Sequence, residues 1–133
     1  MGPALDHLFS PLAIGRKQTR NRIAVTAHNL NWDDNGLLTR EYVDYCARRA
    51  AGGAGMVMCF GAASVHRAAG EIYGRVSLWD PRNETPLREL ADAAHEHGAL
   101  ILSQVNHVGR RGTSAVTERP LLAPSEEPEP AHR

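Results

Sequence analysis

Three short apolar runs punctuate the chain. They are Arg22–Ala27, Gly55–Phe60 and Ala99–Val105, and glycine or polar residues lie close to their ends. Runs of this length are too short for separate helices and are typical of strands that are buried on both faces, as in a parallel sheet. The pattern therefore predicts three strands.

Between these strands, apolar residues recur with the helical period. The first set follows a predicted N-cap at Thr39 and ends at Gly52-Gly53, and the second begins at Thr85-Pro86 and ends at Gly98. Each set places its apolar side chains on one helical face, namely Val43, Cys46, Ala47 and Ala50 in the first and Leu87, Leu90, Ala91 and Ala94 in the second. We therefore expect two amphipathic helices.

The predicted order of strand, helix, strand, helix, strand occurs in doubly wound sheets and in β/α barrels. No G-x-G-x-x-G sequence follows a predicted strand, which weakens the dinucleotide-binding alternative. Long loops after the first two strands, His28–Leu38 and Gly61–Asp80, favour a barrel. Because a whole barrel takes roughly 250 residues and eight strands, we expect an α/β chain that forms the N-terminal part of a TIM (β/α)8 barrel, about three β/α units.

The two ends of the chain show neither the uninterrupted apolar runs of the predicted strands nor the helical period. Leu8–Ile14 is apolar but is interrupted by Pro11, which suits an edge segment better than a central strand. Residues 112–133 contain four prolines and no periodic pattern, so we expect a loop or tail there. The prediction is thus one partial domain over residues 1–133, with the remainder of the barrel absent.

Charge and cysteine content exclude several classes of protein. The formal net charge is zero and no basic run occurs, so nothing indicates binding to nucleic acid or to an anionic membrane. No apolar run approaches the roughly 18 residues that span a bilayer, and Met1–Ser10 lacks the features of a signal peptide. Cys46 and Cys59 lack C-x-x-C spacing and are expected as core thiols in a reducing cytoplasm. His95 and His97 point to different faces of a helix, so we expect no metal site.

Polar groups gather at the carboxyl end of the third apolar run. The sequence changes there to Gln104, Asn106, His107 and Arg110. Amide, imidazole and guanidinium groups at the carboxyl end of a parallel strand mark the edge at which α/β proteins bind ligands. The ends of the first two strands are expected at the same edge.

Five local sequences lie in order along the chain. They are L-F-S-P-L-A-I-G (Leu8–Gly15), N-R-I (Asn21–Ile23), R-A-A-G-G-A-G-M-V-M (Arg49–Met58), H-E-H-G-A-L-I-L-S-Q-V-N-H-V-G-R (His95–Arg110) and A-P-S (Ala123–Ser125). Together they resemble the N-terminal part of the old yellow enzyme family of NADH:flavin oxidoreductases. The nearest branch is that of 2,4-dienoyl-CoA reductase and trimethylamine dehydrogenase.

The resemblance implies a barrel that binds FMN at the carboxyl ends of its strands. It implies that the first strand end lies along the flavin, that Gly61 lies near the isoalloxazine and that Gln104 pairs with the pyrimidine edge. A neutral amide can donate and accept hydrogen bonds there without adding charge to the redox centre. The implied cofactor-binding residues are Ala27, His28, Asn29, Gly61, Gln104, His107 and Arg110. Because Asn29 stands where the amine dehydrogenases have the cysteine that joins FMN covalently, non-covalent FMN is expected.

Two functional hypotheses follow. In the first, the chain belongs to an FMN-dependent oxidoreductase that takes hydride from NAD(P)H and reduces an activated alkene or dienoyl thioester, or that oxidises an amine. The resemblance places the catalytic pair beyond residue 133, together with any 4Fe–4S cluster, so the catalytic residues are unknown. In the second, the chain is non-catalytic, a truncated product or a half-barrel. The expected partners are a small-molecule substrate and a second copy or a complementing chain.

Overall fold

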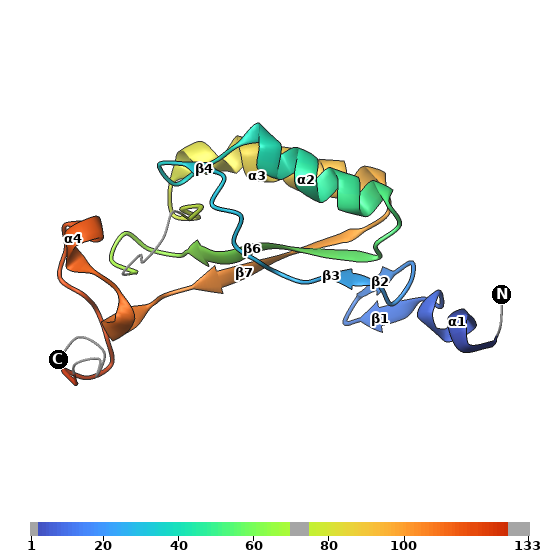
Figure 1. Cartoon of the computed structure of the whole chain (residues 1–133), viewed down its shortest axis with the longest axis horizontal. Helices are drawn as coiled ribbons and strands as arrows, with labels where there is room; N and C mark the ends of the chain where they lie inside the picture. Colours follow the sequence, from blue (N-terminus) through green and yellow to red (C-terminus); the bar gives the residue numbers. More distant parts are fainter. Residues whose placement is uncertain (1–2, 70–74, 128–133) are drawn as a thin grey trace.

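The computed structural model describes residues 3–69 and 75–127. Its centre is a parallel sheet in the order β3-β6-β7, formed by Ala24–Val25, Met56–Ser64 and Leu100–Asn106. Helices α2 (Arg40–Ala51) and α3 (Glu84–Glu96) lie side by side over one face of this sheet, as Figure 1 shows. The predicted alternation of strands and helices and the parallel sheet are confirmed.

The strands differ in length from the prediction. β3 has two residues where Arg22–Ala27 was expected, and it pairs in register with the start of β6 through Ala24 and Met56. β6 continues to Ser64 and so includes the start of the predicted loop Gly61–Asp80. Residues 70–74 of that predicted loop lie outside the described residues.

The N-terminal segment forms its own small unit. α1 covers Pro3–Leu8, and β1 (Leu12–Ile14) pairs antiparallel with β2 (Lys17–Thr19). The segment Leu8–Ile14 is not a central strand, as expected, but its strand β1 belongs to a separate hairpin and not to the edge of the parallel sheet. Gly15 provides the left-handed backbone of the turn, with φ of +59°.

A second hairpin lies in the predicted loop His28–Leu38. β4 (Asp33–Asp34) pairs antiparallel with β5 (Leu37–Leu38). The turn between them is Asn35-Gly36, in which both residues have positive φ, as a type I′ turn requires. Asn-Gly is a common sequence for this turn, so the sequence contained a signal for the hairpin.

The helix ends and the start of α2 agree with the prediction, with Thr39 as the N-cap residue of α2, although its side chain makes no cap hydrogen bond. α2 stops before Gly52-Gly53 and α3 stops before Gly98, as expected. The predicted start of α3 at Thr85-Pro86 is wrong, because the 3-10 helix η1 (Pro81–Asn83) runs directly into a helix that begins at Glu84. Asp80 is the residue that caps η1, and its carboxylate accepts from the Arg82 N–H at 2.9 Å.

The C-terminal region has some helical structure where only loop or tail was expected. The 3-10 helix η2 covers Gly109–Arg111, and the single turn α4 covers Ser114–Thr117. The side chain of Thr113 caps α4 by accepting a hydrogen bond from the Ala115 N–H at 3.3 Å. This local cap explains a helical turn in a segment with no apolar period.

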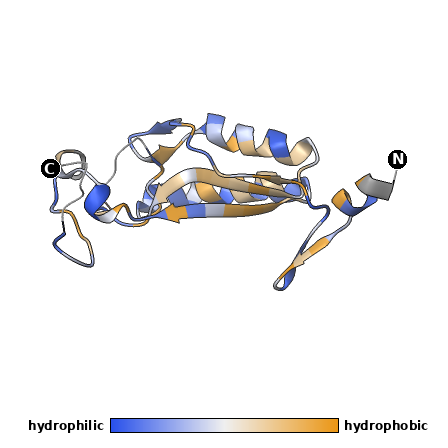
Figure 2. Cartoon of the chain, turned by 60° about the horizontal axis from the view of Figure 1, so that its bottom comes forward, coloured by the Kyte–Doolittle hydropathy of each residue, from blue (hydrophilic) through white to orange (hydrophobic). Residues whose placement is uncertain are grey.

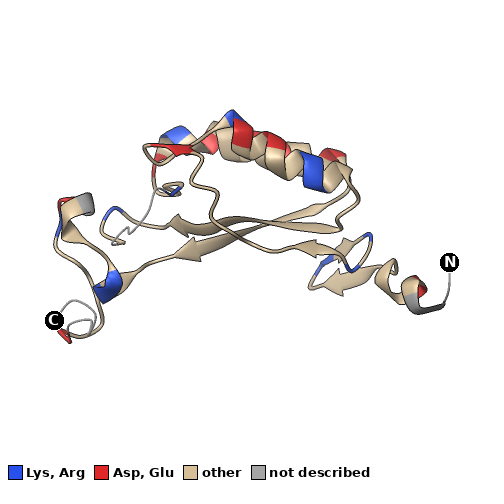
Figure 3. Ribbon diagram, viewed as in Figure 1, with Lys and Arg blue, Asp and Glu red and all other residues tan. Residues whose placement is uncertain are grey.

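The hydrophobic core fills the space between the two helices and the sheet. It includes side chains from β6, α2 and α3: Val57, Cys59, Ala63, Val43, Cys46, Ala50, Leu90 and Ala94. Both thiols are buried, as predicted. The charged residues of α2 and α3 lie outside this core, whereas β6 and β7 carry no charge (Figure 3).

Not every apolar strand residue is covered. Figure 2 shows apolar residues along the strands and also on the N-terminal hairpin. Val105 near the end of β7 is 60% exposed, against the expectation of burial on both faces. β7 is the last strand of its sheet, so its outer edge and the face away from the helices are open here. Within residues 3–69 and 75–127, no helix is long and apolar enough to cross a membrane.

Candidate functional site

Three predicted site residues meet where β6 bends beside the end of β7. The Gln104 side-chain amide donates a hydrogen bond to the Gly61 carbonyl. A Cβ atom added to Gly61 would lie 2.6 Å from the Asn29 Cβ and 2.7 Å from the Asn29 Cα. The main chain at Asn29 thus fills the space that a side chain at position 61 would need. The structure brings Asn29, Gly61 and Gln104 together, and we call them the strand-end cluster.

The backbone immediately before Gly61 has an uncommon conformation. Phe60 has φ of +61° and is buried, a combination that costs conformational energy for a bulky residue. The pairing of β6 with β7 shifts register between Cys59 and Ala63, so Phe60 and Gly61 lie within a bulge. A bulge re-aims the groups that follow it, which here include the Gly61 carbonyl.

Tyr42 of helix α2 holds this bulge. Its hydroxyl accepts a hydrogen bond from the Phe60 N–H at 3.0 Å, and its ring packs against the Phe60 ring with 5.2 Å between centroids. The same hydroxyl donates to the His28 carbonyl at 3.5 Å. Burial raises the pKa of Tyr42, so the hydroxyl keeps its proton and can donate.

The sequence analysis did not identify Tyr42. It is not one of the four residues, Val43, Cys46, Ala47 and Ala50, that recur with the helical period in the first predicted helix. The available signal was its hydroxyl, because a buried phenol normally has a hydrogen-bond partner. Periodicity alone cannot name that partner.

The His28 ring is directed to helix α2. Its Nδ1 lies 3.2 Å from the Thr26 carbonyl, which can only accept, so Nδ1 carries the proton. Its Nε2 then accepts from the Tyr45 hydroxyl at 2.6 Å. Tyr45 in turn packs under the Arg49 guanidinium, 3.5 Å from the ring centroid, and edge-on to Trp32. The His28 backbone, rather than its ring, is thus what connects to the strand-end cluster through Tyr42.

The other predicted residues lie around the cluster or beyond it. Ala27 is half-buried between β3 and Asn29. His107 and Arg110 line a separate, open hollow of about 850 Å³, which residues 122–125 also line. There the His107 Nδ1 accepts from the Gly109 N–H at 3.2 Å, and Arg110 donates to the Glu127 carbonyl at 3.4 Å. The sequence order Q-x-x-H-x-G-R therefore contributes to two neighbouring surfaces and not to one.

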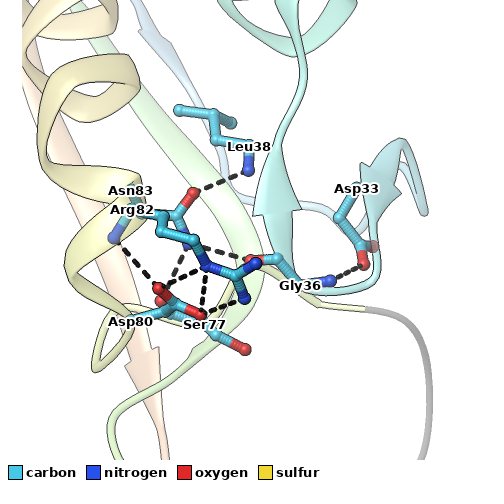
Figure 4. A network of polar contacts seen from close by, with 7 residues as sticks. All are labelled: Asp33, Gly36, Leu38, Ser77, Asp80, Arg82 and Asn83. Carbon is cyan, nitrogen blue, oxygen red and sulfur yellow. Dashed lines mark hydrogen bonds and ion pairs between the residues drawn. The ribbon is translucent and has the colours of Figure 1, made fainter.

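A buried polar network holds the β4–β5 hairpin against the start of α3 (Figure 4). Asn83 is fully buried; its Nδ2 donates to the carbonyls of Gly36 and Ser77 at 2.8 and 2.9 Å. Its Oδ1 accepts from the Leu38 N–H at 2.7 Å. Every polar atom of this side chain is thus used, which makes Asn83 a structural anchor that sequence reasoning missed.

Beside this anchor, Asp80 and Arg82 form an ion pair with contacts of 2.6 to 3.1 Å. Hydrogen bonds from the Arg82 side chain and main chain lower the pKa of Asp80 to about 2. The pair lines a hollow of about 640 Å³ together with Arg67 and Trp79. In the described part of the chain, no group of three or more His, Cys, Asp or Glu side chains could hold a metal ion.

Comparison with known proteins gives relatives that include dehydrogenases and a reductase. N,N-dimethylglycine/sarcosine dehydrogenase of Chromohalobacter salexigens is 38% identical over 133 residues, 98% of this chain and 19% of the relative. The metal reductase of Desulforamulus reducens is 42% identical over 118 residues, 89% of this chain and 17% of the relative. The chain thus spans less than a fifth of the length of these relatives.

Solved structures give the same result. The chain superposes on a 2-naphthoyl-CoA reductase with a TM-score of 0.76 at 31% identity, covering 86% of this chain and 17% of that protein. It superposes on the old yellow enzyme homologue from Zymomonas mobilis with a TM-score of 0.80 at 25% identity, covering 89% and 33%. The fold is therefore that of one part of these enzymes, in agreement with the predicted partial barrel. Residues 7–131 match the family described as NADH:flavin oxidoreductase / NADH oxidase, and the chain belongs to that family.

Proposed function

We propose that the chain forms the part of an FMN-dependent oxidoreductase that positions the flavin ring. The whole enzyme would take hydride from NAD(P)H and pass it to an activated alkene or dienoyl thioester, or would oxidise an amine. The names of relatives that support this proposal include an alkene reductase/demethylase of Caballeronia cordobensis, an NADH oxidase of Thermoanaerobacter brockii and, for the amine, the N,N-dimethylglycine/sarcosine dehydrogenase. The observation that carries the proposal is the strand-end cluster of Asn29, Gly61 and Gln104.

The chemistry of this cluster fits the edge of a flavin. Gln104 is exposed, and with its Nε2 given to Gly61, its Oε1 is the group that would accept from a ring N–H. The strands β6 and β7 that hold the cluster carry no charged residue. When bound, FMN would supply the hydride chemistry. The neutral amides would orient the ring without placing a charge beside it.

The remaining predicted residues have distinct roles in the proposal. The main chain at Ala27, His28 and Asn29 would lie along the ring. The hollow lined by His107 and Arg110 would take an anionic part of the cofactor, because a guanidinium pairs well with phosphate. Non-covalent FMN is part of the proposal, since position 29 offers an amide and no thiol.

A specific observation favours a second candidate, a half-barrel that is completed by a partner chain. Val105 is 60% exposed beside the open edge of β7, and Leu5, Phe9 and Ile14 of the N-terminal unit are 44%, 48% and 39% exposed. Open strand edges with apolar side chains are sites of association. In this candidate, a second copy or another chain would cover these surfaces.

Titration of FMN into the completed barrel, followed by flavin fluorescence, tests the proposal, because residues 1–133 alone are expected to bind FMN only weakly. We expect saturable binding that is roughly ten- to hundredfold weaker in Gln104→Leu, because leucine cannot pair with the flavin edge. Ser103→Ala, at an exposed neighbour of Gln104 on β7, is the matched control and should leave affinity unchanged. Binding that is absent, or equal in wild type and Gln104→Leu, contradicts the role of the cluster. Binding that appears only as the protein associates favours the second candidate.

A further inference from the structure

We infer that Tyr42 is a positioning residue for the strand-end cluster: its hydroxyl fixes the main chain of Phe60 and His28 and thereby sets where Gly61 and Asn29 lie. The functional part of this inference rests on the proposed function, because the cluster is the proposed contact with the flavin edge. The contacts that support it lie within this chain.

The first step is the position of the hydroxyl. It lies between the bulge in β6 and the segment that follows β3, accepting from the Phe60 N–H at 3.0 Å and donating to the His28 carbonyl at 3.5 Å. Each of these residues is directly followed by a member of the cluster, Gly61 in one case and Asn29 in the other. One side chain from helix α2 therefore connects the two backbones that pack against each other at position 61.

The second step is the conformation that the hydroxyl supports. Phe60 has φ of +61°, and its N–H lies in a bulge where it is not paired with β7. An unpaired buried N–H is unfavourable, so the Tyr42 oxygen stabilises this backbone in place of a strand partner. Without the Tyr42 hydroxyl, the buried Phe60 N–H loses this hydrogen bond, and the bulge loses a contact that favours its observed conformation. The Gly61 carbonyl would then be free to turn away from the Gln104 amide.

The third step is that the hydroxyl has a matched counterpart. Tyr45 lies one helical turn further along α2, and its hydroxyl contacts the same residue, His28, but at the ring Nε2 (2.6 Å). Tyr45→Phe therefore removes the same chemical group from the same helix without changing a backbone hydrogen bond of the cluster. Tyr42→Phe keeps the ring that packs on Phe60 and removes only the hydroxyl.

The experiment compares wild type, Tyr42→Phe and Tyr45→Phe by NMR on the full chain. In Tyr42→Phe, the Phe60 amide should exchange with solvent at least about tenfold faster, and the Gln104 side-chain amide resonances should shift. Tyr45→Phe should change neither, although it should change the His28 ring signals. A structural role alone would lower the melting temperature without moving the Gln104 side-chain resonances, and that result would overturn the inference.

A measurement on wild type keeps the inference testable if Tyr42→Phe does not fold. A nuclear Overhauser effect between the Tyr42 ring and the Phe60 amide is expected, and a solvent-exchanging Phe60 amide without this effect would overturn the inference. FMN titration of the same variants in the completed barrel separates the two proposals. If wild type binds no FMN but the NMR differences are present, the proposed function fails and the positioning role stands. If wild type binds FMN, Tyr42→Phe should bind about tenfold more weakly and Tyr45→Phe as wild type.

Discussion

The side-chain amide of Gln104 donates to the main-chain carbonyl of Gly61, which lies 43 residues earlier in the sequence. The contact joins the end of β7 to the bulge in β6. Position 61 is a glycine, and a Cβ atom there would overlap Asn29. A side chain of one strand thus contacts the main chain of the neighbouring strand. A substitution at either Gly61 or Gln104 should therefore change the conformation at both positions.

Gly61→Ala should disturb the strand-end cluster. The added Cβ would lie 2.6 Å from the Asn29 Cβ, which is closer than packed carbons approach, so one backbone segment must move. We expect a loss of about 1–3 kcal/mol in the free energy of unfolding, measured by urea denaturation, and altered Asn29 and Gln104 amide resonances. Gly15→Ala is the control: it strains a left-handed turn in open space, so it should lower stability without changing those resonances. Unchanged Asn29 signals in Gly61→Ala would contradict the close packing.

The sequence was sufficient for the order of elements, and it named three residues that the structure brings together, Asn29, Gly61 and Gln104. Apolar runs without a helical period led to the strands, and the rule that parallel strands present ligands at their carboxyl ends led to Gln104, whereas Asn29 and Gly61 came from the family resemblance. These inferences succeed because period and strand direction are local properties of the chain. The resemblance added the cofactor, and the family match supports that assignment.

The errors have a different physical origin. The roles of Tyr42 and Asn83 depend on backbone groups that are 18 and 45 residues away, and no local pattern encodes such a distance. The start of α3 was misplaced because Thr85-Pro86 is a good local start, while Asp80-Pro81 is also one and begins the preceding 3-10 helix. Tertiary contacts decide between two acceptable local signals.

Asn83→Asp should destabilise the fold strongly. It keeps an oxygen for the Leu38 N–H but replaces the two N–H donors to Gly36 and Ser77 with an acceptor, and the residue is fully buried. Leaving two carbonyls without donors should lower the free energy of unfolding by at least about 2 kcal/mol, again by urea denaturation. The exposed Asn31→Asp is the matched control and should change it by less than about 0.5 kcal/mol. Equal stability of the two variants would rule out the anchor role.

The two cysteines should be unreactive in the folded protein. Burial raises the pKa of the Cys46 thiol to about 11 and that of the Cys59 thiol to about 12. Since only the thiolate reacts, alkylation by iodoacetamide at pH 8 should be at least about a hundredfold slower than in urea. Mass spectrometry measures the extent of labelling. Stoichiometric labelling of either cysteine under native conditions would show that the core opens or that the thiol is accessible.

Stability towards acid should depend on Asp80. Its pKa is lowered to about 2 by hydrogen bonds from Arg82, so the folded state favours the carboxylate. A group with a lowered folded pKa contributes stability above its unfolded pKa, 3.8, and loses that contribution as the pH falls through 2. The melting temperature of wild type should therefore fall between pH 4 and pH 2, and Asp80→Asn should remove this part of the fall. Asparagine can still cap the Arg82 N–H, so the variant should fold at neutral pH.

Asp92→Asn, at an exposed position of α3, is the control and should melt as wild type does at each pH. If Asp80→Asn shows the same acid dependence as wild type, the loss of stability arises from another carboxyl group.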